Sequence, residues 1–249
     1  MDLSNRTVLV TGGSSGIGLG IAEAFLQAKS RVIICGRDVE RLRVVEQRHP
    51  EITTIPCDVG DAPQRQALAR EVLRRFPDLD ILVNNAGIQR YIDLKKGYED
   101  LKSGEDEIAI NFVSTVELTA LFITSLLERP AASIINVSSA LGLMPMVNMP
   151  VYCATKAAIH TYTLVLRQQL KDTPVKVVEI LPPTVETGLN QAGRSAARNR
   201  YKGISVEEYM PTVIQGLESD TDMIFHGEGT KLMSQPRRES EGRLLNPSW

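Results

Sequence analysis

The sequence predicts an α/β protein built on a doubly wound parallel sheet. Short β-branched runs alternate with longer segments of helical periodicity along most of the 249 residues. The runs VLV and VIIC are apolar on both faces, as in a parallel sheet that helices cover on each side. A glycine-rich turn follows the first run directly and opens the first helix, which is the order expected of a nucleotide-binding sheet.

The expected elements fill the chain in regular order. The strands are expected at residues 7–10, 31–35, 52–55, 81–84, 133–137 and 175–181, with a shorter seventh at 222–226. The helices are expected at residues 16–28, 39–48, 62–76, 105–127, 151–170 and 206–217. This alternation over the whole length predicts a single domain, residues 1–249.

Residues 182–205 interrupt the alternation, because they are rich in Pro, Gly, Asn and Arg and lack apolar periodicity. A loop of this length is uncommon inside a compact domain and is usually functional or disordered. We expect a substrate lid after the sixth strand, extending to about residue 220, with a solvated connection as the alternative. Residues 234–249 form a polar tail, which is expected to be a surface extension.

Composition excludes several classes of protein. Hydrophobic residues make up 43% and charged residues 23%, which is typical of globular domains. The net charge of −2 gives no electrostatic footprint for a nucleic acid. No signal-peptide layout and no run of about 18 apolar residues is present, and the three cysteines lack zinc-site spacing. We therefore expect a cytoplasmic protein with no nucleic-acid partner, no integral membrane association and no metal.

Residues 11–18, TGGSSGIG, are expected to bind the phosphates of a dinucleotide. Gly12, Gly16 and Gly18 lack a Cβ where the chain must bend sharply and approach a pyrophosphate. The helix that follows offers free backbone N–H groups, which attract anions. Ser14, Ser15 and Ile17 complete the loop, whose alternative role is a tight turn without a ligand. Its place after the first strand makes the predicted sheet a Rossmann-type sheet.

The G-x-x-x-G-x-G spacing of this loop resembles the short-chain dehydrogenase/reductase family, and four further motifs follow in the family's order. They are Asn84-Asn85-Ala86-Gly87, Asn111, Ser139 and the segment from Tyr152 to Lys156. The resemblance covers roughly residues 6–189 and is to the compact branch of the family. Pro182-Pro183, with VYCATKAAIH upstream, is similar to the DltE-like subgroup of oxidoreductases.

The candidate catalytic residues are Tyr152, Lys156, Ser139 and Asn111. Tyr152 and Lys156 are four apart on a predicted helix and so share one face, where a cation about 4–6 Å away favours the phenolate. Ser139 ends the fifth strand at the carboxyl edge of the sheet, where its hydroxyl can bind a substrate carbonyl oxygen. Ser138 is the neighbouring candidate, and it fits the family spacing less well. The resemblance implies that Asn111 holds a water that links Lys156 to solvent.

The residues after the second strand favour NADP(H), with NAD(H) still possible. Gly36 stands where an acidic residue would bind the ribose 2′-hydroxyl, and Arg37 follows with a guanidinium suited to a phosphate. Asp38 is the competing signal, and we expect it to be the N-cap of the next helix.

The resemblance implies further cofactor contacts. Asp58 would contact the adenine, although a turn or helix-cap role is the alternative, and Thr187 would contact the carboxamide. Asn85 and Gly87 would line the nucleotide, and Tyr152 and Lys156 would bind it as well. Asn84, by contrast, is expected to stabilise the sheet.

The function expected from these motifs is an NADP(H)-dependent oxidoreductase that interconverts a small carbonyl compound and a secondary alcohol. The alternative is a non-catalytic nucleotide-binding regulatory module of the same fold. An epimerase or dehydratase of the longer branch of the family fits the short chain and the loop spacing poorly. The resemblance also implies a homodimer or homotetramer that packs through residues 105–127 and 151–170.

Overall fold

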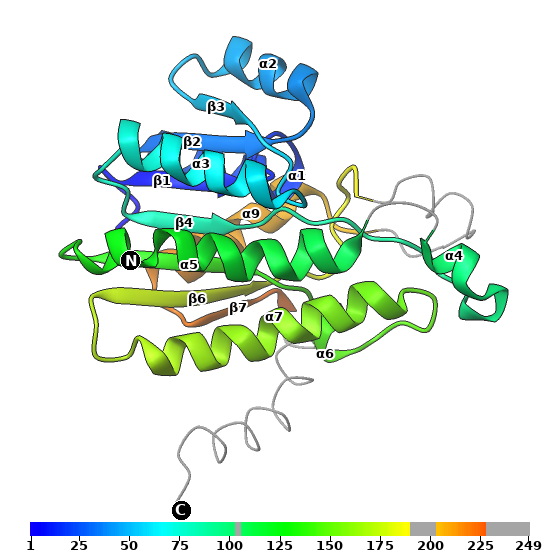
Figure 1. Ribbon diagram of the computed structural model, residues 1–249. Coiled ribbons are helices and arrows are strands. Elements are labelled where there is room, and N and C mark those ends of the chain that lie inside the picture. Colours follow the sequence, from blue (N-terminus) through cyan, green and yellow to red (C-terminus); the bar gives the residue numbers. More distant parts are fainter. Residues whose placement is uncertain (103–105, 190–202, 228–249) are drawn as a thin grey trace, which may run out of the picture.

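The computed structural model describes residues 1–102, 106–189 and 203–227, which form one parallel seven-stranded sheet in the order β3-β2-β1-β4-β5-β6-β7 (Figure 1). The strands are β1 (Thr7–Thr11), β2 (Arg31–Gly36), β3 (Thr53–Pro56), β4 (Ile81–Asn84), β5 (Ala132–Val137), β6 (Val175–Leu181) and β7 (Met223–Phe225). The predicted doubly wound parallel sheet is confirmed, and the short seventh strand is present.

Helices cover both faces of the sheet (Figure 1). One layer consists of α1 (Gly16–Gln27), α2 (Val39–Arg48) and α9 (Val206–Glu218), and the other of α3 (Ala62–Arg75), α5 (Ser114–Leu127) and α7 (Pro150–Gln169). Four short elements lie in the connections after β4 and β5, namely η1 (Leu94–Lys96), α4 (Tyr98–Lys102), η2 (Ile108–Val113) and α6 (Ala140–Leu143).

The strand order reverses between β1 and β4, which are neighbours although two strands separate them in sequence. From β1 the chain runs outward through β2 to β3, and from β4 it runs the other way through β5 to β6. At such a reversal the loops after the two central strands diverge to opposite faces and leave a crevice at the carboxyl edge, where open α/β sheets bind their ligands. The fold therefore places the site after β1 and β4.

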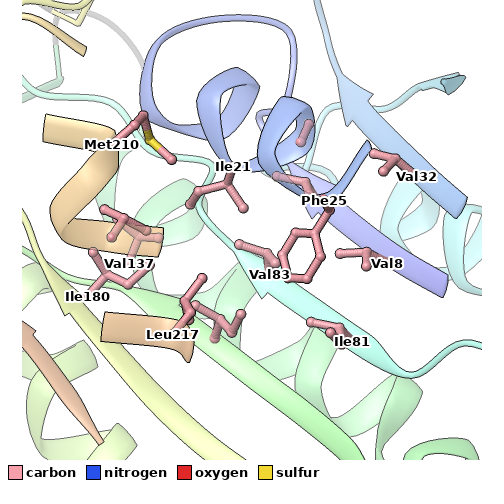
Figure 2. Close-up of a cluster of buried hydrophobic side chains, with 14 of the residues drawn as sticks. Val8, Ile21, Phe25, Val32, Ile81, Val83, Val137, Ile180, Met210 and Leu217 are labelled. Carbon is pink, nitrogen blue, oxygen red and sulfur yellow. The ribbon is translucent and has the colours of Figure 1, made fainter. Parts of the chain in front are cut away.

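The core explains why the strand runs are apolar on both faces. Val8 and Val10 of β1 belong to the buried cluster beneath α1 and α9, whereas Leu9 belongs to the cluster beneath α3 and α5. Figure 2 shows the first cluster, in which the ring of Phe25 lies among the aliphatic side chains of β1 and β4. Each strand residue therefore packs against one helix layer or the other.

The predicted helix over residues 105–127 is two elements. It begins with the π-helical turn η2 and continues as α5 from Ser114. A π-turn contains one more residue per turn than an α-helix, and apolar periodicity does not reveal it. Inside η2, Asn111 turns its side chain toward Ile88 in the loop after β4.

Residues Ile108–Leu127 have a mean hydropathy of 1.6 and are long enough to cross a membrane. The core helix of a globular protein passes the same test, and this segment packs against the sheet through Leu118, Phe122 and Leu126.

The predicted lid is partly within the described residues, and the predicted tail lies wholly outside them. Residues 190–202 and the tail 234–249 lie outside them. Residues 206–218 form α9, which packs on α1 with Tyr209 and Val213 fully buried. A parallel bridge joins Val185 to Ile204 and brings the start of α9 back beside the end of β6.

Phe25→Ala should lower the free energy of unfolding by about 3–5 kcal/mol, because it removes a fully buried ring and leaves a cavity. Urea unfolding followed by circular dichroism measures this change. The control is Val147→Ala, at a side chain that is 98% exposed, where a change within about 0.5 kcal/mol is expected. Equal effects of the two substitutions would contradict the packing described for α1.

Candidate functional site

A cavity of about 760 Å³ opens at the carboxyl edge of the sheet, where the strand order reverses. Segments that follow each of the strands β1 to β6 line it, together with α7. The predicted site residues that line it are Gly12, Ser14, Ser15, Gly16, Ile17, Gly18, Arg37, Asp58, Asn85, Gly87, Ser139, Tyr152, Lys156 and Thr187. Asn111 is the one predicted residue that is not in the lining; it is fully buried.

The glycine loop is held open toward this cavity. Gly12 and Gly16 have φ values of +64° and +56°, which residues with a Cβ rarely adopt. A Cβ on Gly18 would lie 2.3 Å from Nδ2 of Asn85 and 2.4 Å from the Gly12 carbonyl oxygen, so only glycine fits there. Ser15 occupies the N-cap of α1 without a capping hydrogen bond from its side chain. The N-terminus of α1 thus forms an anion site of the kind a pyrophosphate fits.

Asn85 ties this loop to the end of β4. Its Nδ2 donates to the carbonyl oxygens of Thr11 at 2.9 Å and Gly12 at 3.2 Å. The Thr11 hydroxyl accepts the backbone N–H groups of Asn85 and Ala86 and donates to the carbonyl oxygen of Val83. Asn84 instead bonds Asn136 of β5 at 2.9 Å, so the prediction that Asn84 stabilises the sheet is confirmed.

Two arginines border the cavity after β2. Asp38 is the N-cap of α2, as predicted, and its carboxylate accepts the backbone N–H of Arg41 at 3.0 Å. The same carboxylate holds the Arg41 guanidinium at 3.0 Å. Arg37 and Arg41 both line the cavity. Sequence reasoning missed Arg41; its place one helical turn after Asp38 was the available signal.

Asp58 and Thr187 make local contacts at the cavity wall. The Asp58 carboxylate accepts the backbone N–H of Gly60 at 2.8 Å, so it also stabilises its own turn. The Thr187 hydroxyl accepts the backbone N–H of Leu189 at 3.2 Å. The methyl group of Thr187 faces Gly16, where a Cβ would come within 2.9 Å of it. The segment after β6 therefore touches the loop after β1.

Tyr152 and Lys156 are both buried on the cavity side of α7. The Lys156 Nζ lies 5.7 Å from the centre of the Tyr152 ring and donates to the carbonyl oxygen of Val137 at 2.8 Å. Burial lowers the pKa of Lys156 from its ordinary value to about 8, and the negative charge of Glu179 partly opposes this effect. The ammonium thus stays largely charged at neutral pH beside the phenol.

Ser139 is the N-cap of α6, and its Oγ accepts the backbone N–H of Leu141 at 3.1 Å. A hydroxyl that accepts one hydrogen bond keeps its own proton to donate. Close packing of α6 on α7 sets its position, since a Cβ on Gly142 would come within 2.8 Å of the Lys156 backbone. Ser138 differs, because its hydroxyl donates to the buried carboxylate of Glu179.

Asn111 lies beneath the cavity rather than in its wall. Its Nδ2 donates to the Ile88 carbonyl oxygen at 2.9 Å and to Thr155 Oγ1 at 3.1 Å, and its Oδ1 accepts the Ile88 N–H at 2.8 Å. A Cβ on Gly87 would lie 3.3 Å from Asn111 Oδ1 and 3.6 Å from Lys156 Nζ. Asn111 and Lys156 therefore flank the same glycine.

Sequence reasoning also missed a buried pair behind α7. Glu179 of β6 is fully buried, and His160 of α7 is 2% exposed. The His160 Nδ1 lies 2.9 Å and 3.1 Å from the two carboxylate oxygens of Glu179. A glutamate within the apolar run VKVVEIL was the signal in the sequence.

Comparison with known proteins agrees with this architecture. The short chain dehydrogenase family model matches residues 6–198. The chain is 50% identical over 218 residues to the uncharacterized oxidoreductase DltE of Bacillus subtilis, covering 88% of this chain and 86% of that protein.

Two solved structures are similar over nearly the whole chain. A short chain dehydrogenase from Burkholderia cenocepacia in complex with NADP has a TM-score of 0.80 and 26% identity, covering 99% of this chain and all of that one. A short chain dehydrogenase/reductase from Burkholderia phymatum in complex with NAD has a TM-score of 0.81 and 20% identity, covering 100% and 98%, and shows the fold alone. With the family model and the DltE likeness spanning most of its length, the chain belongs to the short-chain dehydrogenase/reductase family of oxidoreductases.

Proposed function

We propose that this oxidoreductase interconverts a small carbonyl compound and a secondary alcohol, with NADP(H) as its preferred cofactor. The observation that carries the proposal is that Tyr152, Lys156 and Ser139 line the same cavity as the glycine loop. A nucleotide bound on that loop and a substrate bound at the tyrosine would therefore share one enclosed space. When bound, the nicotinamide group supplies or accepts the hydride.

The nucleotide would be held by groups at the edge of the sheet. The loop containing Gly12, Gly16 and Gly18 lines the cavity at the N-terminus of α1, where a pyrophosphate would be bound. In this proposal Asp58, Asn85, Gly87 and Thr187 line the rest of the nucleotide site.

The proton would move through Tyr152. In the reductive direction its hydroxyl donates a proton to the carbonyl oxygen, which Ser139 orients through a hydrogen bond. The ammonium of Lys156 favours the phenolate that results. Asn111 and Lys156 both lie beside Gly87. This proximity supports a proton relay from Lys156 toward solvent through a water held at Asn111.

The preference for NADP(H) rests on Arg37. Arg37 follows β2 at the cavity wall, where its positive charge would favour a 2′-phosphate. Arg41 lies at the same wall, but its guanidinium is paired with the Asp38 carboxylate. NAD(H) remains the alternative, since the acidic Asp38 follows Arg37 directly and also lines the cavity. The non-catalytic regulatory module is disfavoured, because the chain belongs to an oxidoreductase family and its Tyr–Lys–Ser–Asn residues are all present.

We also propose a homodimer or homotetramer in the cytoplasm. Support for assembly comes from a shallow apolar hollow on the outer face of η2 and α7. It is formed by Phe112, Ala157, Ala158, Thr161, Tyr162 and Val165. The cytoplasmic location stays a prediction from the sequence.

Tyr152→Phe should lower kcat by a factor of about 10²–10⁴, the usual contribution of a general acid, while the Kd for NADPH stays the same. The hydroxyl is removed and the ring that packs in the cavity is kept. Steady-state kinetics on a panel of aldehydes, ketones and quinones, with a fluorescence titration of NADPH, measures both quantities. Undiminished turnover in the variant would refute the proposed role of Tyr152.

Arg37→Ala should raise the KM for NADPH by about 10–100-fold, the equivalent of one lost charge-assisted hydrogen bond, and leave the KM for NADH nearly unchanged. The matched control is Arg43→Ala, on the helix α2 that follows Arg37, whose guanidinium pairs with Glu40 outside the cavity lining. If the KM values for NADPH and NADH rise equally, the proposed selectivity is wrong.

Val165→Asp should dissociate the proposed oligomer, because it places a charge in the apolar hollow. Sedimentation velocity at micromolar concentration is expected to show a multimer for the wild type and a monomer for the variant. Val44→Asp is the control, since Val44 is equally exposed on α2, outside that hollow. A monomeric wild type would contradict the assembly.

A further inference from the structure

Glu179 is a fully buried acidic side chain on β6, between β5 and the edge strand β7. Its backbone pairs with Asn136 of β5, and its carboxylate lies within hydrogen-bond distance of His160 and Ser138. Moving a carboxylate from water into a protein interior costs several kcal/mol unless polar partners compensate. Glu179 does not line the cavity, so neither cofactor nor substrate contact accounts for it.

The partners of Glu179 are neighbours of the proposed catalytic residues. His160 follows Lys156 by one helical turn on α7, and Ser138 precedes Ser139 at the end of β5. Lys156 donates to the carbonyl oxygen of Val137, the residue before Ser138. The carboxylate is therefore anchored to the two elements, β5 and α7, that carry the catalytic side chains.

The charge of Glu179 acts on Lys156. Within the described part of the chain, burial and Glu179 are the influences on the pKa of Lys156, and burial is the larger. The other groups around the ammonium are Tyr152 and His160 on α7, the Val137 carbonyl on β5 and the uncharged amide of Asn111 beneath Gly87. The negative charge of Glu179 thus offsets part of the effect of burial on the ammonium.

We infer that Glu179, held by His160 and Ser138, is a positioning residue that keeps Lys156 protonated in its buried place. Its importance for turnover rests on the proposed function, whereas its effect on Lys156 does not. Its action is indirect, through the charge of Lys156 beside Tyr152.

The direction of the pH effect follows from the two charges. Lys156 loses its proton as the pH rises through its pKa of about 8. Without the anion the ammonium is less stable, so the proton is lost at a lower pH. The fraction of protein with a charged Lys156 then falls around neutral pH. The alkaline limb of the pH profile of kcat moves to lower pH as well.

The experiment is a titration of Lys156 by NMR in protein labelled with ¹³C at the lysine ε-carbon. The Lys156 signal is assigned as the one missing from Lys156→Arg, and no substrate is needed. Glu179→Gln keeps the size of the side chain and removes its charge, and its Lys156 midpoint should fall by roughly one pH unit, the low end of the usual effect of a neighbouring opposite charge. An unchanged midpoint would overturn the inference.

The matched control is Glu107→Gln, which removes another buried carboxylate that has no influence on Lys156. Its Lys156 midpoint should equal that of the wild type, and an equal fall in both variants would overturn the specific role of Glu179. If Glu179→Gln does not fold by circular dichroism, Glu179→Met replaces it. That change also removes the negative charge and keeps an unbranched side chain of similar length, so the Lys156 midpoint should again fall, and a constant midpoint would overturn the inference.

Turnover assays, combined with the Lys156 titration, distinguish a failure of this inference from a failure of the proposed function. If the Lys156 midpoint falls but no carbonyl substrate is turned over, the inference stands and the proposed function fails. If turnover depends on Tyr152 but the midpoint stays constant in Glu179→Gln, the proposed function stands and the inference fails. A purely structural role for Glu179 would lower kcat equally at every pH, whereas the inference requires the alkaline limb to move.

Discussion

The hydrogen bonds between the ends of β1 and β4 are the interaction on which the site depends. Asn85 and Thr11 join the loop after β4 to the glycine loop after β1, at the place where the strand order reverses. The side chain of Asn85 fills the space that a Cβ on Gly18 would need. The glycine loop is therefore shaped from the neighbouring strand as well as by its own backbone.

A second constraint is the enclosure of charge beneath that cavity. Lys156 is removed from water, and the carbonyl of Val137 and the carboxylate of Glu179 replace part of the lost hydration. Such fixed groups need no rearrangement when charge develops nearby, which is how enzymes stabilise ions more strongly than water does. The arrangement connects the interior of the sheet to the electrostatics around Tyr152.

Much of the fold follows from local patterns, because each strand of a covered parallel sheet must be apolar on both faces. The alternation of Val8, Leu9 and Val10 between the two helix layers is a direct example. Spacing also brought Tyr152 and Lys156 together, since four residues make about one helical turn. The partners of Glu179 could not be predicted in this way, because His160 and Ser138 reach it across elements that are distant in sequence.

The π-turn η2 has a consequence for how this segment can change during evolution. Successive residues of a helix are rotated by about 100°, so removing one residue before Asn111 would swing its amide away from Ile88 and Thr155. Exchanging one apolar side chain for another on the outer face leaves that orientation intact. The orientation of Asn111 thus depends more on the length of residues 108–113 than on the identity of their exposed side chains, so this segment tolerates a substitution on its outer face better than an insertion or a deletion.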